Sequence, residues 1–155
     1  MTSLPDIAVF SQRGRRFAVL HGGMSDVSRF LWPCSSEAAF AEEIELIQRE
    51  VGPVDAVVAG HCGLPFSRTL MGVEWINAGV IGMPANDGQP ATRCAALHAD
   101  GHAVFRELCY DHASARAGME RVGLTQGYHT ALETGYWPSE DVLPPELRRA
   151  AVARG

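Results

Sequence analysis

The chain has 155 residues, with 13 basic and 18 acidic side chains and a formal net charge of −5. This length suits one domain, and 46% hydrophobic with 20% charged residues is a globular rather than a disordered composition. All 13 basic residues are arginine, which excludes a phosphate-loop lysine and lysine Schiff-base chemistry. The acidic balance argues against nucleic acid as a stable partner.

The sequence also limits the compartment in which the protein works. No window approaches the roughly 18 consecutive apolar residues of a membrane span, and Asp6 interrupts the N-terminal apolar run that a signal peptide would need. The four cysteines show no CxxC spacing, so reduced thiols are expected rather than a zinc knuckle or a disulfide framework. We therefore predict a cytoplasmic protein without a membrane partner.

The first half of the chain predicts short strands around one helix. Apolar β-like runs cover 7–10, 17–20 and 54–59. Between them, Ser35 or Ser36 can cap a helix over 36–51 that Gly52-Pro53 ends. Its apolar residues recur at i, i+4, i+7 and i+11, as on one face of a helix: Phe40, Ile44, Ile47 and Val51.

The second half predicts two hairpins followed by helices. One hairpin is expected over 67–76 through Met71-Gly72, and a second pairs 92–98 with 102–110 around an Asp-Gly turn. The long loop over 77–90 between them is typical of a functional loop. The rest predicts a helix from the cap Asp111 to Val122, a short helix over 128–133, and a tail that is extended and then weakly helical to Gly155.

Two histidines, His21 and His61, each follow an apolar strand directly, and each has a glycine neighbour. In α/β folds ligands bind at the ends of strands, and glycine lets the backbone approach an ion or phosphate closely. Each histidine alone could simply end a core strand, but the pair together points to a ligand site.

Other nucleophilic chemistry fits the sequence less well. His21-Gly22-Gly23 could form part of a lipase-like oxyanion hole, but the required G-x-S-x-G motif is absent. Cys62 follows His61 directly, and adjacent side chains of an extended chain point to opposite sides, so His61 is poorly placed to act as its base. A small buried thiol is the better interpretation of Cys62.

The remaining histidines are weaker candidates. His98 and His102 face each other across the predicted Asp-Gly turn and could hold a metal, but no third ligand is evident. His112 and His129 fall in helical or capping positions without a partner, and we interpret both as structural.

Residues 15–110 resemble the C-terminal half of calcineurin-like metallophosphoesterases, through four segments in matching order: 17–22 (FAVLHG), 57–61 (VVAGH), 64–66 (LPF) and 76–82 (INAGVIG). The part from Asp111 onward resembles the tail of a bacterial branch of the same family. The resemblance implies an α/β fold, half of an α/β/β/α sandwich, with a mixed sheet and flanking helices. It divides the chain into a half-domain over 1–135 and a C-terminal tail over 136–155.

The resemblance further implies a hydrolase of phosphoric esters that uses two divalent ions. Such ions activate a bridging hydroxide and neutralise the phosphate oxygens. His21 matches the histidine of the family's His-Gly strand end, and His61 the first histidine of its GHxH motif. Both would bind the same ion, whose identity (manganese, zinc, iron or nickel) stays open, while Gly22, Gly60 and Asn77 would lie near the phosphate.

The sequence departs from the family pattern in its ligands. Gly63 replaces the second histidine of GHxH, and the GDxH, GDxxD and GNH(D/E) motifs are absent. One ion therefore loses every ligand and the other keeps two imidazoles, below the three protein ligands of an ordinary catalytic site. No catalytic residue can be assigned, and the chain alone is expected to be inactive, with no metal necessarily bound.

These observations leave two functional hypotheses. The first is a metallophosphoesterase-type hydrolase of a phosphoester small molecule, present as an incomplete C-terminal half. The alternative is a non-catalytic interaction module derived from the same fold. In either case we expect the half-sandwich to expose an apolar sheet face, covered by a second copy of the chain or by a separate N-terminal half. The first hypothesis predicts ligating nitrogens of His21 and His61 within about 3–4.5 Å of each other.

Overall fold

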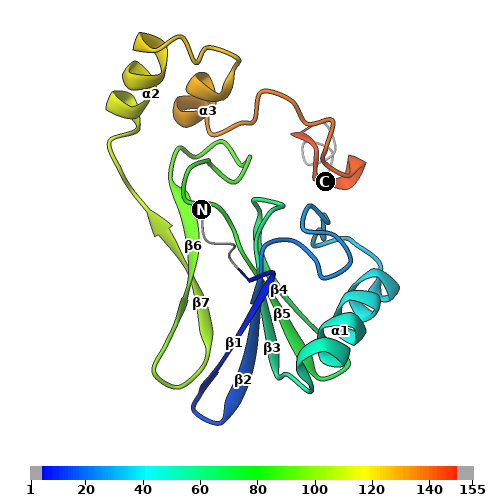
Figure 1. The fold of residues 1–155 in the computed structure, drawn as a ribbon. Helices are drawn as coiled ribbons and strands as arrows, with labels where there is room; N and C mark the ends of the chain where they lie inside the picture. The colour runs from blue at the N-terminus through cyan, green and yellow to red at the C-terminus, as the bar shows by residue number, and fades with distance from the viewer. Residues whose placement is uncertain (1–4, 150–155) are drawn as a thin grey trace.

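A computed structural model describes residues 5–149, in which a five-stranded mixed sheet is accompanied by a two-stranded hairpin and three helices (Figure 1). The sheet has the order β1-β2-β3-β5-β4 and the hairpin is β6-β7. Its strands are β1 (Ile7–Gln12), β2 (Arg15–Leu20), β3 (Ala56–Ala59), β4 (Pro65–Leu70), β5 (Val73–Ala78), β6 (Thr92–Leu97) and β7 (Ala103–Leu108). The helices are α1 (Glu37–Val51), α2 (His112–Arg121) and α3 (Tyr128–Thr134), followed by a 3₁₀ turn at Pro145–Leu147.

Parallel pairing at the centre of the sheet decides where the strand ends meet. β2 pairs with β3 and β3 with β5 in parallel, and α1 makes the crossover between β2 and β3. Ser36 caps α1 by accepting a hydrogen bond from the Ala39 amide, as its sequence predicts. The carboxyl ends of the three strands therefore lie side by side at one edge of the sheet.

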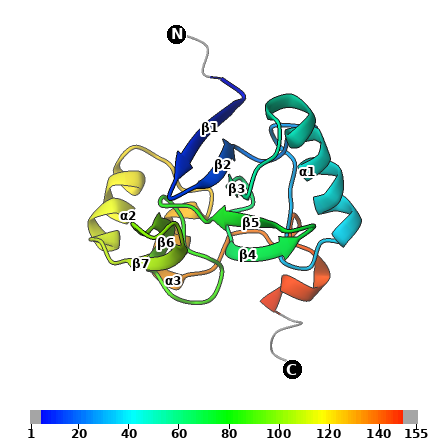
Figure 2. The same ribbon diagram turned by 90° about the horizontal axis from the view of Figure 1, so that it is seen from below.

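The two faces of the sheet are covered by different elements. Successive strand residues point to opposite faces, so Ala18 and Val57 pack towards α1, whereas Phe17 and Ala56 face the hairpin. Figures 1 and 2 show α1 and β6-β7 on opposite sides of the sheet. The core is one contiguous cluster on the α1 side and a smaller cluster under the hairpin.

Hydrogen bonds from the β1-β2 turn tie the tip of the β6-β7 hairpin to the main sheet. Gln12 donates to the carbonyl of His98 at 2.6 Å, and Arg15 donates to that of Gly101 at 2.6 Å. Arg15 also forms an ion pair with Glu74 of β5 at 2.7 Å. His98 and His102 thus belong to a hairpin turn anchored at the opposite end of β2 from His21.

The segment after α3 returns to the main core. Trp137 and Leu143 are buried in the same cluster as α1, and the Trp137 indole N–H donates to the Pro84 carbonyl at 2.8 Å. Residues 150–155 of the predicted weak helix lie outside the described part, and the division at 135/136 stays a prediction. No helix within residues 5–149 is long and apolar enough to cross a membrane.

Candidate functional site

His21 and His61 lie at the carboxyl ends of the adjacent parallel strands β2 and β3. The Nε2 atom of His21 is 2.9 Å from Nδ1 of His61, and the ring centroids are 4.9 Å apart in an edge-to-face arrangement. The predicted convergence of the two imidazoles is therefore confirmed. At this distance the rings share a hydrogen bond, which needs one of them to donate and the other to accept.

A tight turn presents the His61 ring. His61 has a φ of 60°, in the left-handed region that a residue with a side chain enters only at a cost in free energy. Two backbone hydrogen bonds hold the turn, because the Gly60 amide donates to the His21 carbonyl at 2.8 Å and the Cys62 amide to the Gly60 carbonyl at 2.7 Å. The first of these bonds links the two histidine-bearing segments directly.

Asn77 supports this turn from the neighbouring strand β5. Its side chain is buried, donates to the Gly60 carbonyl at 2.5 Å, and accepts from the Gly79 amide at 3.2 Å. Both ends of the carboxamide are thus engaged by backbone, which makes Asn77 a positioning residue. The prediction that Asn77 and Gly60 lie near a bound phosphate stays a prediction.

The loop after His21 owes its shape to two glycines. A Cβ atom at Gly22 would lie 2.4 Å from the Val27 carbonyl oxygen, and one at Gly23 would lie 2.7 Å from the Arg29 side chain. No real side chain tolerates such contacts. The loop itself therefore requires glycine at position 22, whatever its distance from a phosphate.

Glu43 of α1 is a positioning residue for the loop after His21 that the sequence analysis missed. It is fully buried and accepts hydrogen bonds from the amides of Met24 (2.6 Å) and Ser25 (3.0 Å) and from the Ser25 hydroxyl. Arg29 lies 3.6 Å from the carboxylate. An available signal was the position of Glu43 on the apolar face of α1, beside Phe40 and Ile44, where a charge needs a partner.

The protonation states at the strand ends follow from burial. Burial lowers the pKa of His61, and the neighbouring His21 lowers it further, against a smaller opposing effect of Asp26. The neutral imidazole favoured in this way is the form that binds metals. Burial raises the pKa of Cys62 to about 11, and its thiol contacts the Leu64 carbonyl, as expected for a small buried thiol rather than a nucleophile.

Position 63 disfavours a second histidine of the GHxH type, through its backbone conformation and a tight contact. Gly63 has a φ of 76°, and a Cβ atom there would lie 3.2 Å from Cζ2 of Trp137. Within the described residues, no three His, Cys, Asp or Glu side chains are grouped so that they could hold a metal. Among the described residues, His21 and His61 are thus a pair of imidazoles without a third side chain that could complete a metal site.

No protein-family model and no curated protein matches the chain in sequence. Solved structures do match its fold. The hypothetical protein PH1004 from Pyrococcus horikoshii OT3 superposes with a TM-score of 0.70 at 15% identity, over 85% of this chain and 51% of that one. A metallophosphoesterase from Sphaerobacter thermophilus gives a TM-score of 0.69 at 20% identity, over 86% and 58% of the two chains.

The protein thus has a metallophosphoesterase-like fold, which confirms the predicted resemblance and fold class. Its sheet is mixed and its helices flank it, as that fold class requires. The chain spans a little more than half the length of these two structural relatives.

Replacing Glu43 by glutamine tests its role as anchor of the loop after His21. We expect Glu43→Gln to lower the free energy of unfolding by about 1–3 kcal/mol, because an amide nitrogen would face the donors that the carboxylate now satisfies. Urea denaturation and amide exchange at Met24 and Ser25 measure the effect. Glu42→Gln, at a neighbouring exposed position, is the matched control and should change stability by less than about 0.5 kcal/mol. Equal effects of the two variants would contradict the anchoring role.

The lowered pKa of His61 predicts a pH dependence of stability. Since the unfolded chain binds this proton at about pH 6.5 and the folded chain only at lower pH, stability should fall as the pH drops below 6.5. His61→Asn removes the titrating group and tolerates the positive φ, so its loss of stability from pH 7.5 to 5.5 should be smaller. Urea midpoints across this range provide the measurement, with the exposed turn variant His102→Asn as control. A steeper loss in His61→Asn than in the unmodified chain would refute the lowered pKa.

Proposed function

We propose that this chain is the metal-binding portion of a metallophosphoesterase-type hydrolase, with His21 and His61 as ligands of one divalent ion. The observation that carries the proposal is the 2.9 Å approach of two imidazole nitrogens at adjacent strand ends of a metallophosphoesterase-like fold. In α/β proteins this edge of the sheet is where ligands bind. The substrate class is a phosphoester small molecule.

The residues present fit half of such a site. Imidazole suits zinc, nickel and iron, and both rings can direct a nitrogen to one ion if they separate slightly from their hydrogen-bonded distance. A pair of bound divalent ions would supply a nucleophilic hydroxide and neutralise phosphate oxygens. The chain's own part is to hold two imidazoles in place, through the Asn77-supported turn and the Glu43-anchored loop, and to keep His61 neutral.

The proposed site needs further ligands from outside these 155 residues. We propose a separate N-terminal half, or a second copy of this chain, seated on the hairpin side of the sheet. Supporting this, the chain covers only 51% and 58% of its structural relatives, and that side carries half-buried Val58, Ala95 and Leu97 beside the more exposed Phe105. Apolar side chains at such a face favour contact with another surface.

One observation favours the non-catalytic alternative, an interaction module. The Trp137 ring lies 3.2 Å from the point where a side chain at position 63 would begin, so that an aromatic ring crowds the region of the second GHxH histidine. The binding of a metal by the two histidines distinguishes the hypotheses, because an interaction module has no need of it.

We expect the purified chain to bind one equivalent of Zn²⁺ weakly and to show negligible turnover of bis(4-nitrophenyl) phosphate with excess manganese, zinc or nickel. Two ligands hold an ion loosely, and the second ion has none. Calorimetric titration should show that His21→Ala and His61→Ala abolish zinc binding, whereas His102→Ala does not. Zinc binding unaffected by His21→Ala would refute the ligand assignment. Robust turnover that His21→Ala abolishes would show that other residues complete the site.

We expect the chain at micromolar concentration to sediment as a dimer or to form a stable complex with a separately expressed N-terminal half, burying more than about 1,000 Å². Phe105→Asp should weaken the association because it places a charge on the apolar hairpin face. Met71→Asp, an equally apolar but more exposed position at the β4-β5 turn, is the matched control. A chain that stays monomeric at this concentration and forms no complex with the N-terminal half would contradict the proposal.

A further inference from the structure

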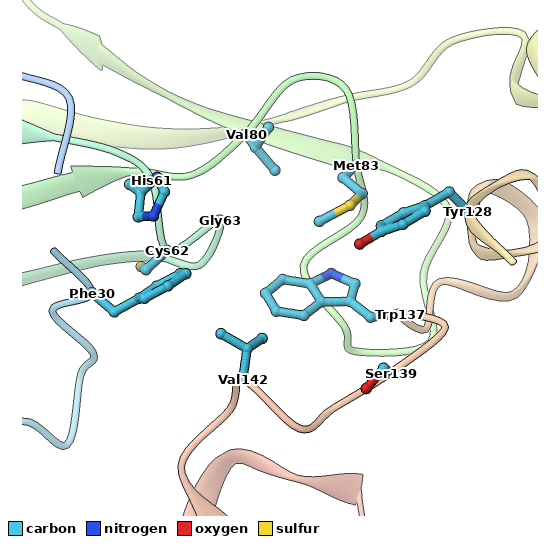
Figure 3. Close-up of a pocket in the computed structure, with 10 residues that line it drawn as sticks. All are labelled: Phe30, His61, Cys62, Gly63, Val80, Met83, Tyr128, Trp137, Ser139 and Val142. Atoms are coloured by element: carbon cyan, nitrogen blue, oxygen red, sulfur yellow. The ribbon is translucent and has the colours of Figure 1, made fainter. Parts of the chain in front are cut away.

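An apolar cavity of about 200 Å³ lies beside the histidine pair, between the turn after β3 and the segment that follows α3 (Figure 3). Its walls are mainly aromatic and aliphatic: Phe30, Val80, Met83, Tyr128, Trp137 and Val142. His61 lines one end of it, and Gly63 forms part of the wall. The cavity and the candidate metal ligands are therefore parts of one continuous surface.

The lining carries no acidic or arginine side chain. A charged group that entered the cavity would lose its hydration without gaining an opposite charge. The occupant must therefore be a neutral, apolar group.

The aromatic walls are held rigidly. The indole of Trp137 donates to the Pro84 carbonyl at 2.8 Å, and its backbone amide donates to Asn86 Oδ1 at 2.8 Å. Phe30 stacks on Trp32 with ring centroids 5.1 Å apart and lies 4.4 Å from the His61 ring. Preorganised flat surfaces favour a planar ring, because aromatic pairs gain from stacked and edge-to-face contacts.

Glycine at position 63 leaves the part of the cavity wall next to Trp137 and Val80 without a side chain. A Cβ atom there would lie 3.2 Å from the Trp137 ring and 3.6 Å from Val80 Cγ1, in the space that separates these walls. Glycine at this position therefore adds no side-chain atoms to the apolar space next to His61. At about 200 Å³ the space is smaller than pockets that enclose a whole drug-sized ligand, about 300–1,000 Å³, so only part of a ligand enters.

We infer that this cavity binds the planar aromatic group of a phosphate ester whose phosphate lies outside it, at His21 and His61. The inference rests on the proposed function and adds the substrate class, an aryl or similarly flat ester. The uncharged walls take the ring, and the anionic end stays at the imidazoles where solvent and a bound ion can reach it. His61 belongs to both parts of the site, since it lines the cavity and meets His21.

Three probes separate the two parts of this ligand: 1-naphthyl phosphate, 1-naphthol and inorganic phosphate, each titrated into the full chain with equimolar Zn²⁺. The indole N–H signal of Trp137, identified by its loss in Trp137→Phe, reports on the cavity. We expect 1-naphthyl phosphate to shift this signal and to bind at least about tenfold more tightly than either inorganic phosphate or 1-naphthol. Inorganic phosphate should not change the chemical shift of the Trp137 indole N–H signal.

Substitutions at the cavity and at His21 test where the ring and the phosphate of the ligand bind. Val142→Trp fills the cavity from a partly exposed loop and should weaken 1-naphthyl phosphate about tenfold, whereas Val122→Trp, an exposed valine outside the cavity, should not. Phe30→Leu is a second variant that removes a stacking surface, and an unchanged indole signal of the buried Trp75 establishes that each variant is folded. His21→Ala should reduce the affinity for 1-naphthyl phosphate to that for 1-naphthol.

Equal binding of 1-naphthyl phosphate and inorganic phosphate, with the Trp137 signal unmoved, would overturn the cavity assignment and leave the proposed function intact. Binding of 1-naphthol as tight as that of 1-naphthyl phosphate, unaffected by His21→Ala, would overturn the phosphate ester and the proposed function together. Insensitivity to both Val142→Trp and Phe30→Leu would place the ring elsewhere and refute the inference.

Discussion

The site depends on the parallel pairing of β2 with β3. Parallel strands end at the same edge of a sheet, so a histidine that follows each strand meets its counterpart across a spacing set by the backbone ladder. Helix α1 makes this pairing possible, since it carries the chain back to the start of β3. The same helix supplies Glu43, which holds the loop after His21, and thus one element both builds the sheet and shapes the site.

Much of the polar interior serves the backbone around the histidines rather than a ligand. Glu43 and Asn77 are buried, and each satisfies its hydrogen bonds mainly with backbone groups of the two histidine-bearing segments. A buried polar group left without such partners would cost about 1–3 kcal/mol, more than the roughly 0.5–1.5 kcal/mol that a typical bond contributes. His61 keeps its positive φ because the hydrogen bonds of this surrounding network hold the turn in place.

Gly63 and Trp137 together give this chain its own version of the metallophosphoesterase-like fold. The glycine removes a side chain at the strand end, and the tryptophan arrives from the far end of the chain to occupy the adjoining space. The edge of the sheet at which we propose ligand binding is thereby divided into a polar part at the imidazoles and an apolar part beyond them. Such a division suits a molecule with one charged and one flat apolar end, and it makes the segment after α3 a component of the site.

The sequence determined the elements, the convergence of the histidines and the fold class, because these follow from local periodicity, strand ends and the ordered Gly-His segments. Phe40, Ile44 and Ile47 marked α1, and the Asp-Gly turn marked the β6-β7 hairpin, since both patterns depend on residues close in sequence. Only the tertiary structure showed that Glu43 anchors a loop about twenty residues away, that Asn77 holds a turn, and that Trp137 closes on Gly63. These contacts join segments that are distant in sequence. A local sequence pattern does not specify which backbone segment a buried polar side chain or an aromatic ring will contact.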